Sequence, residues 1–268
     1  MSTTAFDAPE IIRLRDIFTE MESAVIAYSG GVDSTFLLKA AVLSGIGTMA
    51  VTAVSPAMPG QDFRDAKDIA RRLGVRHTII ESGELELAEF VKNPVDRCFY
   101  CKDHLFGRLK EIARSAGYRF VLDGSNLDDL HDWRPGRKAA LKHGIRSPLI
   151  EAGLRKQDVR RLSRELSLPT WDKPSSPCLS SRFPYGETIT REALKQVEAA
   201  ETFLKSLGFQ EVRVRHHRDV ARIELKEQDI PKMLNPETRT AVREKLISLG
   251  YKFVSLDLEE FRSGRLNG

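Results

Sequence analysis

The chain has 268 residues, of which 41% are hydrophobic and 30% charged, and its formal net charge is +4. These values are typical of a globular protein with one large domain or a main domain plus a small one, and the small positive excess fits an acidic small-molecule substrate or a weak nucleic-acid contact. The chain has only three cysteines, which excludes a disulfide scaffold, and it has no apolar run of about 18 residues, which excludes a membrane span. Because its start also lacks a signal-peptide pattern, we expect a cytoplasmic protein.

The first half of the chain alternates short β-branched runs with amphipathic stretches. The runs predict strands at residues 24–29, 48–55, 76–82 and 119–125. The stretches predict helices at residues 33–45, 60–74, 101–117 and 154–169. Strand–helix alternation of this kind predicts an α/β fold, with a parallel sheet covered by helices on both faces.

The pattern changes after a stretch rich in Pro, Ser and Gly at residues 172–190, which we interpret as a loop. The remaining segments predict a helix, two strands, a second helix and a last strand, at residues 191–207, 211–217, 221–227, 229–249 and 252–259. This order describes a small α+β unit. We therefore expect two domains, residues 1–182 and 183–268.

The most specific local motif is SGGVDS, which stands between the first expected strand and the first expected helix. Two consecutive glycines permit positive φ angles and a close approach of a ligand to the backbone. The N–H groups at a helix start suit an anion, and the hydroxyls of Ser29 and Ser34 add donors. Asp33 could hold a magnesium ion that bridges phosphates. The alternative is an ordinary glycine turn with a Ser/Asp cap; the motif is neither a Walker A loop nor GxGxxG.

In this strand–loop–helix setting, SGGVDS resembles the PP-loop of ATP pyrophosphatases, which cleave ATP between its α- and β-phosphates and adenylate a substrate oxygen. The resemblance implies a Rossmann-like parallel sheet. It implies that the pyrophosphate end of ATP is bound by Ser29, Gly30, Gly31, Val32, Asp33 and Ser34. It also places Ser55 near the adenosine and Gly124, Ser125 and Asn126 near the nucleotide.

Four longer segments of the sequence indicate a particular family among the PP-loop enzymes. The segments DGSNLDDLHDWRPGRKAA, LPTWDKPSSPCLSSRFPYG, VRVRHHRDVARIEL and FRSGRLN together resemble the LarE family over nearly the whole chain. That family builds the nickel-pincer nucleotide: it adenylates the carboxylate of a pyridinium carboxylate mononucleotide and converts it to a thiocarboxylate. The resemblance implies a homo-oligomer, with a hexamer as one candidate form. We expect a small-molecule substrate and no nucleic-acid or membrane partner.

A sulfur nucleophile is required once the carboxylate is adenylated, because a thiolate can then displace AMP. Cys178 stands in the loop that the family uses for this purpose. The nearby Arg182 would favour the thiolate and is also a candidate for substrate binding. The alternative for a lone cysteine is a small buried side chain.

The pair Cys98 and Cys101 forms a CxxC motif. The resemblance to three-cysteine members of the family implies that both, with Cys178, hold a 4Fe–4S cluster whose open iron carries the sulfur. From the residues alone, a zinc site completed by His104 and Cys178, a redox pair and two inert thiols stay open. The family also contains members that spend a single cysteine.

Several charged residues are candidates for substrate or metal contacts. Arginines that match those of the family, at an expected phosphate site, are Arg213, Arg215 and Arg262. A solvated edge strand is the alternative. A possible active-site wall holds Asp128, Asp129, Asp132, Arg134 and Arg137, or these form a solvated loop. Possible metal or subunit contacts are Glu201, Glu224 and Asp229, whereas His216 and His217 are expected to be solvated.

Three other functions remain open at this point. A PP-loop enzyme that thiolates a tRNA base would need a nucleic-acid surface, and no RNA-binding module is recognisable. An amide-forming PP-loop ligase would use ammonia and would not need Cys178. A nucleotide-sensing module would bind ATP without releasing pyrophosphate.

Overall fold

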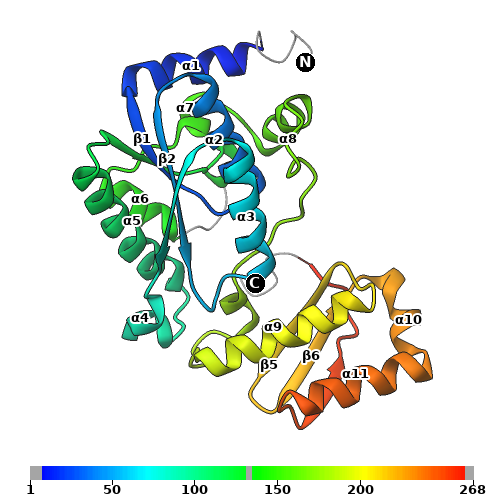
Figure 1. Ribbon diagram of the computed structural model, residues 1–268. Coiled ribbons are helices and arrows are strands. Elements are labelled where there is room, and N and C mark those ends of the chain that lie inside the picture. The colour runs from blue at the N-terminus through cyan, green and yellow to red at the C-terminus, as the bar shows by residue number, and fades with distance from the viewer. Residues whose placement is uncertain (1–7, 131–134, 263–268) are drawn as a thin grey trace. The chain divides into compact units, whose positions relative to one another are not determined.

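The computed structural model describes residues 8–130 and 135–262 (Figure 1). The chain divides into two compact units. Unit 1 comprises Met1–Glu84 and Asp96–Ser176, and unit 2 comprises Leu85–Val95 and Pro177–Gly268. The division expected from the sequence, residues 1–182 and 183–268, stays a prediction about domains.

The sheet of unit 1 confirms the predicted fold class. Its strands are β1 (Ser23–Ala27), β2 (Gly47–Val54), β3 (Arg76–Glu81) and β4 (Phe120–Leu122). They pair in the order β3-β2-β1-β4, and all three pairings are parallel. Each strand coincides with one of the four runs predicted from β-branched composition.

Helices flank this sheet (Figure 1). They are α1 (Pro9–Met21), α2 (Val32–Leu43), α3 (Gly60–Arg72), α5 (Arg97–Ser115), α6 (Gly136–His143), α7 (Pro148–Glu151) and α8 (Lys156–Glu165), with η2 (Leu127–Leu130) before α6. Helices α1, α6 and α7 were not predicted. The signal for α1 was present, since Leu14, Phe18 and Met21 recur at helical spacing and are buried.

Two separate apolar cores lie on the two faces of the sheet. Ala24 and Ile26 of β1 pack into a core that includes residues of α1, α2 and α8. Val25, between them, packs into a core with residues of α5 and α6. This alternation is the period-2 consequence of strand geometry, and it explains why β1 is apolar at consecutive positions from Ala24 to Ala27.

Unit 2 has a three-stranded sheet with its own core. Its regular elements are α4 (Ala88–Val91), α9 (Arg191–Ser206), β5 (Val212–His217), β6 (Val220–Leu225), α10 (Ile230–Leu234), α11 (Pro236–Ser248) and β7 (Phe253–Leu256). Single 3-10 turns are η1 (Glu84–Glu86), which begins in unit 1, η3 (Leu179–Arg182) and η4 (Glu227–Asp229). The strand order is β5-β6-β7, antiparallel between β5 and β6 and parallel between β6 and β7.

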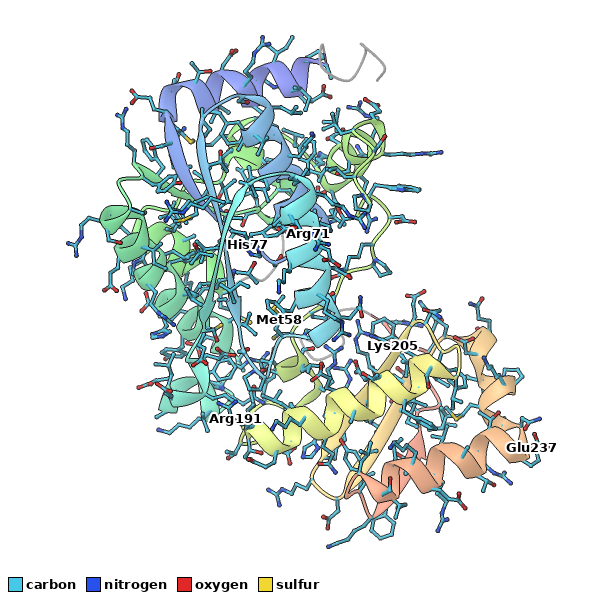
Figure 2. The ribbon with its side chains drawn as sticks, viewed as in Figure 1. Met58, Arg71, His77, Arg191, Lys205 and Glu237 are labelled. Carbon is cyan, nitrogen blue, oxygen red and sulfur yellow. The ribbon has the colours of Figure 1, made fainter. Side chains whose placement is uncertain are left out.

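The single helix predicted at residues 229–249 is wrong, because two helices occupy this range. Asn235 has φ −55° and ψ 131°, and its side chain accepts from the N–H groups of Glu237 and Thr238. Pro236 disfavours a helical conformation at the residue before it, so the chain stops at Asn235 and begins again with a new cap. Glu237 lies at the start of the second helix (Figure 2).

Leu85–Val95 is an excursion of the chain from unit 1 into unit 2. The excursion is fastened there by main-chain bonds from Gly186 N to Asn93 O and from Ile189 N to Val91 O, both 2.9 Å. Nδ2 of Asn93 also donates to the carbonyl of Pro184 at 2.7 Å. No element of the described residues has the length and apolarity of a membrane-crossing helix.

Candidate active site

The loop between β1 and α2 has the geometry of an anion-binding turn. Gly31 caps α2 in an extended conformation, and the helix begins at Val32. Gly30 has φ +72°, and a Cβ atom at this position would lie 2.7 Å from the Cβ of Ala66 in α3. Glycine is therefore required at position 30 for two reasons, the positive φ angle and the close contact with α3. The first N–H groups of α2 have no intrahelical acceptor and are available to phosphate.

The two serine hydroxyls of the loop face each other. Oγ of Ser29 and Oγ of Ser34 are 3.1 Å apart. The N–H of Gly31 donates to Ser29 Oγ at 3.4 Å, and Ser34 Oγ donates to the carbonyl of Gly31 at 3.3 Å. These contacts hold the loop in one conformation around Gly31. The expected roles of Ser29 to Ser34 in ATP binding stay predictions.

Asp33 is the acidic residue of the loop, and its two oxygens have different partners. Oδ1 accepts from Nδ2 of Asn126 at 3.2 Å. Oδ2 accepts from Nζ of Lys156 at 2.5 Å, in a pair whose side chains are 24% and 37% exposed. A lysine ammonium thus neutralises the carboxylate that we expected to hold magnesium.

Lys156 was not identified from the sequence as a functional residue. It is the first residue of α8, and its main-chain N–H donates to Oδ2 of Asp128 at 2.8 Å. Oδ1 of Asp128 accepts from Nη1 of Arg155 at 2.9 Å. Asp128 therefore sets the position at which α8 begins, and this brings the lysine amine to the phosphate loop. The position of Lys156 beside the phosphate loop depends on contacts between residues far apart in the sequence, so the sequence alone did not reveal it.

Gly124 approaches the start of α2 closely. A Cβ atom here would lie 3.0 Å from the main-chain N of Ser34 and 3.2 Å from the carbonyl carbon of Asp33. Asp123 accepts from the hydroxyls of Ser125 at 2.8 Å and Ser147 at 2.6 Å. The segment after β4 is thus a wall beside the phosphate loop, with its polar groups bonded internally.

The charged residues predicted to form the active-site wall do not all share one environment. Asp129 is buried and accepts from the N–H of Asn126 at 3.0 Å, so it is not a solvated side chain. Asp132 and Arg134 lie outside the described residues. Arg137 is on α6.

Ser55 follows β2 directly and belongs to the turn that leads into α3. Its Oγ accepts from the N–H of Ala57 at 3.0 Å, and its carbonyl accepts from the N–H of Met58 at 3.1 Å. Met58 lies at this turn, whereas Arg71 lies toward the other end of α3 (Figure 2). The carboxyl ends of β1 and β2 are at one edge of a parallel sheet, where ligands of such folds bind. The assignment of Ser55 to adenosine stays a prediction.

The three cysteines lie in two units and form no disulfide with one another. Cys98 is exposed and Cys101 is partly exposed, and both lie in the first turns of α5 in unit 1. Cys178 is exposed and directly precedes η3 in unit 2. Within residues 8–130 and 135–262, no three His, Cys, Asp or Glu side chains are assembled as a metal site. The predicted three-cysteine ligand set therefore stays a prediction.

Arg182 is fully buried in unit 2, and its donors are engaged inside the protein. Nε and Nη2 bind the two oxygens of Glu201 at 2.9 and 2.8 Å. Nη1 donates to the carbonyls of Pro177 at 2.8 Å and Cys178 at 3.1 Å. Burial acts to raise the pKa of the Glu201 carboxyl, but the charge and hydrogen bonds of Arg182 outweigh it and hold this pKa below its usual value.

Arg213 and Arg215 share one face of β5, as predicted, and both are buried instead of solvated. Arg215 donates to the carbonyl of Ser181 and to Oε2 of Glu224, both at 2.7 Å. Arg213 donates to the carbonyl of Val212 at 2.8 Å, and its guanidinium lies 4.7 Å from the ring centroid of Phe261.

Burial, with the charge of Arg182, lowers the pKa of Arg213 to about 10. We call Arg182, Arg213 and Arg215 the arginine cluster. The next candidate, Arg262, is exposed. The substrate-binding roles of all four arginines stay predictions.

The three acidic candidates for metal or subunit contacts lie in unit 2, and these roles stay predictions. Glu201 and Glu224 are buried partners of the arginine cluster, and Asp229 ends the turn η4. The expectation of a solvated His216 is wrong, because the ring is 8% exposed and its Nδ1 lies 3.2 Å from the hydroxyl of Tyr251.

Comparison with known proteins gives relatives along the whole chain. The chain is 44% identical over 255 residues to the uncharacterized protein slr1717 of Synechocystis, covering 95% of each chain. It is 43% identical over 250 residues to the pyridinium-3,5-bisthiocarboxylic acid mononucleotide synthase of Lactiplantibacillus plantarum, covering 92% of this chain and 90% of that one. A tRNA-specific 2-thiouridylase of Azorhizobium caulinodans is 28% identical over 232 residues, which cover 70% of this chain and 59% of the relative. No protein-family model matches the chain.

Proposed function

The chain belongs to the LarE-like family of PP-loop ATP pyrophosphatases, and we propose that it is an ATP-dependent sulfur transferase acting on a pyridinium carboxylate mononucleotide. The observation that carries this proposal is the 43% identity to the mononucleotide synthase over 92% of the chain. The geometry of the phosphate loop supports the ATP-dependent half of the reaction.

The first step is adenylation, in which the substrate carboxylate attacks the α-phosphorus of ATP and pyrophosphate leaves. The N–H groups at the start of α2, with the hydroxyls of Ser29 and Ser34, would bind the leaving phosphates. Asp33 would hold Mg²⁺, which when bound would supply positive charge that stabilises the leaving pyrophosphate. Lys156, beside Asp33, would transfer its ammonium contact from the carboxylate to a phosphate oxygen when the nucleotide binds.

The second step delivers sulfur to the acyl adenylate, and AMP leaves as the thiocarboxylate forms. We propose that Cys98, Cys101 and Cys178 hold a 4Fe–4S cluster, which when bound supplies a hydrosulfide nucleophile. Reduced thiols at adjacent turns of one helix suit such ligation. Cys98 is the third residue after Val95 and Cys178 the second after Ser176, so each stands beside a point where the chain passes between units.

The alternative within the same function is a sacrificial cysteine. Cys178 would then attack the acyl adenylate itself and give up its sulfur when its Cβ–S bond breaks, with loss of the α-proton. The chain would end with dehydroalanine at this position after one turnover. Three cysteines in the sequence, two of them in a CxxC motif, favour the cluster.

The decisive measurement is iron and acid-labile sulfide content of protein prepared without oxygen, combined with product counting. We expect about four irons per chain, lost when any one cysteine becomes alanine, and several thiocarboxylates per chain. No iron, one product per chain and a loss of the mass of H₂S would establish the sacrificial mechanism.

Pyrophosphate release tests the adenylation half. Asp33→Ala should abolish release and Lys156→Met should lower it about 100-fold, because both act on the charged phosphates. Release with tRNA instead of the mononucleotide, together with a mobility shift of tRNA, would favour the thiouridylase function of the more distant relative.

We also infer a homo-oligomer in the cytoplasm. Exposed apolar side chains of unit 2 support self-association, since Phe253 is 64% exposed, Leu234 55% and Leu258 97%. Sedimentation would show a monomer if this inference is wrong.

A further inference from the structure

The segment between α8 and Cys178 is fastened to unit 1 on one side by α8. Nη1 of Arg160 donates to the carbonyl of Trp171 at 2.8 Å, and Nη2 donates to the carbonyl of Lys173 at 2.9 Å. The guanidinium of Arg164 lies 5.0 Å from the ring centroid of Trp171. One helix therefore holds both the backbone and an aromatic side chain of this segment.

On the other side, the segment is fastened to α3. Nζ of Lys173 lies 3.0 Å from Oδ1 of Asp62 and 2.8 Å from Oδ2 of Asp65. Oγ of Ser176 donates to Oδ2 of Asp62 at 2.6 Å. We call these four residues the α3 latch. Burial acts to lower the pKa of Lys173, but hydrogen bonds to Asp65 and Asp62 outweigh it and raise this pKa, so the ammonium stays charged.

The latch differs from an ordinary surface ion pair. The side chains of Lys173 and Asp62 are only 19% and 14% exposed, and one ammonium bridges two carboxylates. Partly buried pairs with shared hydrogen bonds are screened less by water than exposed ones. The latch is therefore screened less than an exposed ion pair, and it ties this segment to α3.

Helix α3 connects the latch with the phosphate loop. Ala66, which makes the close contact with Gly30, follows Asp62 and Asp65 within about one turn of the same helix. Ser176 is the last residue of unit 1. One rigid helix thus supports both the loop expected to bind ATP and the point at which the chain leaves for Cys178.

The chain is held again directly after this point. Pro177 and Cys178 both offer their carbonyls to Nη1 of the buried Arg182. Cys178 therefore lies between an anchor in unit 1, which ends at Ser176, and an anchor in unit 2. The chain is therefore bonded on both sides of this step, through the hydroxyl of Ser176 and through the carbonyls of Pro177 and Cys178.

We propose that Lys173 and Asp62 are positioning residues for sulfur transfer, because the α3 latch holds the chain before Cys178 where the adenylated carboxylate can be reached. This inference rests on the proposed function. The latch acts through Cys178 and bonds to no residue of the loop Ser29 to Ser34, so adenylation does not require it.

The test separates the two half-reactions in one variant. Lys173→Met keeps the length of the side chain and removes its charge. We expect thiocarboxylate formation to slow by about tenfold or more, since small displacements of a reacting group cost that much. Pyrophosphate release with the mononucleotide should stay within about twofold of wild type, because the phosphate loop is unchanged. Equal loss of both rates would overturn the inference.

A control is Lys142→Met, which breaks a more exposed lysine–aspartate pair, with Asp103 in the same unit at 2.8 Å. It should change neither rate. Lys173→Arg keeps the charge and can contact both carboxylates, so it should restore transfer to within about threefold of wild type. Asp65→Asn combined with Lys173→Met should add little to the effect of either change alone, because both break one contact. Additive losses would contradict the latch.

Labelling of Cys178 by iodoacetamide, followed by peptide mass analysis, makes the test independent of activity. If wild-type protein releases no pyrophosphate with the mononucleotide, the proposed function is wrong and labelling alone decides the latch. A faster reaction of Cys178 in Lys173→Met, with Lys142→Met unchanged, would support the latch. An unchanged reaction rate would overturn it.

Discussion

The phosphate loop of unit 1 and the arginine cluster of unit 2 were both expected to bind phosphate, yet they are built in opposite ways. The loop offers main-chain N–H groups at a helix start and half-exposed side chains. The cluster consists of buried guanidiniums whose donors already bind carboxylates and carbonyls of unit 2. A ligand can occupy the loop directly, whereas at the cluster it must compete with internal partners.

The difference teaches that an arginine in a phosphate-like pattern does not identify a free anion site. Arg182 and Arg215 donate to main-chain carbonyls of Pro177, Cys178 and Ser181, which belong to the segment that carries the thiol. Their charges are balanced by Glu201 and Glu224. In this structure the cluster organises the Cys178 segment, and the exposed Arg262 is the candidate that stays accessible.

The largest effect should come from breaking the cluster. Glu201→Gln leaves the buried Arg182 without its counter-charge, so unfolding free energy should fall by about 3–5 kcal/mol. The matched control is Glu192→Gln, at an exposed position of the same helix, with an expected loss below about 0.5 kcal/mol. Urea unfolding measures both, and equal effects would mean that the cluster does not stabilise unit 2.

Lowering the pH should remove the same contribution of Glu201 to the free energy of unfolding. The folded pKa of Glu201 lies below its usual value, so the ionised carboxylate stabilises the fold above about pH 4.3, and this stability is lost as pH falls through the folded pKa. The stability difference between wild type and Glu201→Gln should be constant from about pH 5 to pH 8 and shrink below about pH 4. A difference that grows in acid would contradict the assigned charges.

A smaller loss of stability is expected when a methyl group is added at Gly30 in the phosphate loop. Gly30→Ala forces a side chain onto a left-handed residue and against Ala66, which should cost about 2–3 kcal/mol of unfolding free energy. Gly31→Ala is the matched control, since its φ is −79° and its Cβ would meet only Ser29 Oγ at 3.4 Å. Its loss should stay below about 1 kcal/mol in the same urea experiment. Similar losses for the two variants would contradict the described loop.

The smallest effect is expected at the exposed Arg262, where we predict a change in substrate affinity. Arg262→Gln should raise the KM for the mononucleotide about fivefold to tenfold with no loss of stability, if a phosphate is bound there by a charge-assisted contact. Arg239→Gln, on the exposed face of α11, should leave KM unchanged. An unchanged KM in Arg262→Gln would remove this residue from the substrate site.

Much of the fold could be predicted because its signals are local. The four strands of unit 1 coincide with short runs rich in β-branched or apolar residues, and the motif from Ser29 to Ser34 stands between a strand and a helix within a few residues. The break at Asn235 was also visible in the sequence as an Asn–Pro pair, but the apolar periodicity around it masked the signal. The alternation of strands and helices was enough to predict a parallel sheet.

The sequence by itself thus determined the strands, the phosphate loop and the candidate cysteines, because each depends on residues adjacent in the chain. The contacts between Lys156 and Asp33, between Arg182 and Glu201, and between Lys173 and α3 were decided only by the tertiary structure. Each of these pairs joins side chains of different segments, and their partners follow from how whole elements pack. Spacing along the chain carries no record of such packing, and this is why the internal partners of the arginine cluster could not be predicted from the sequence.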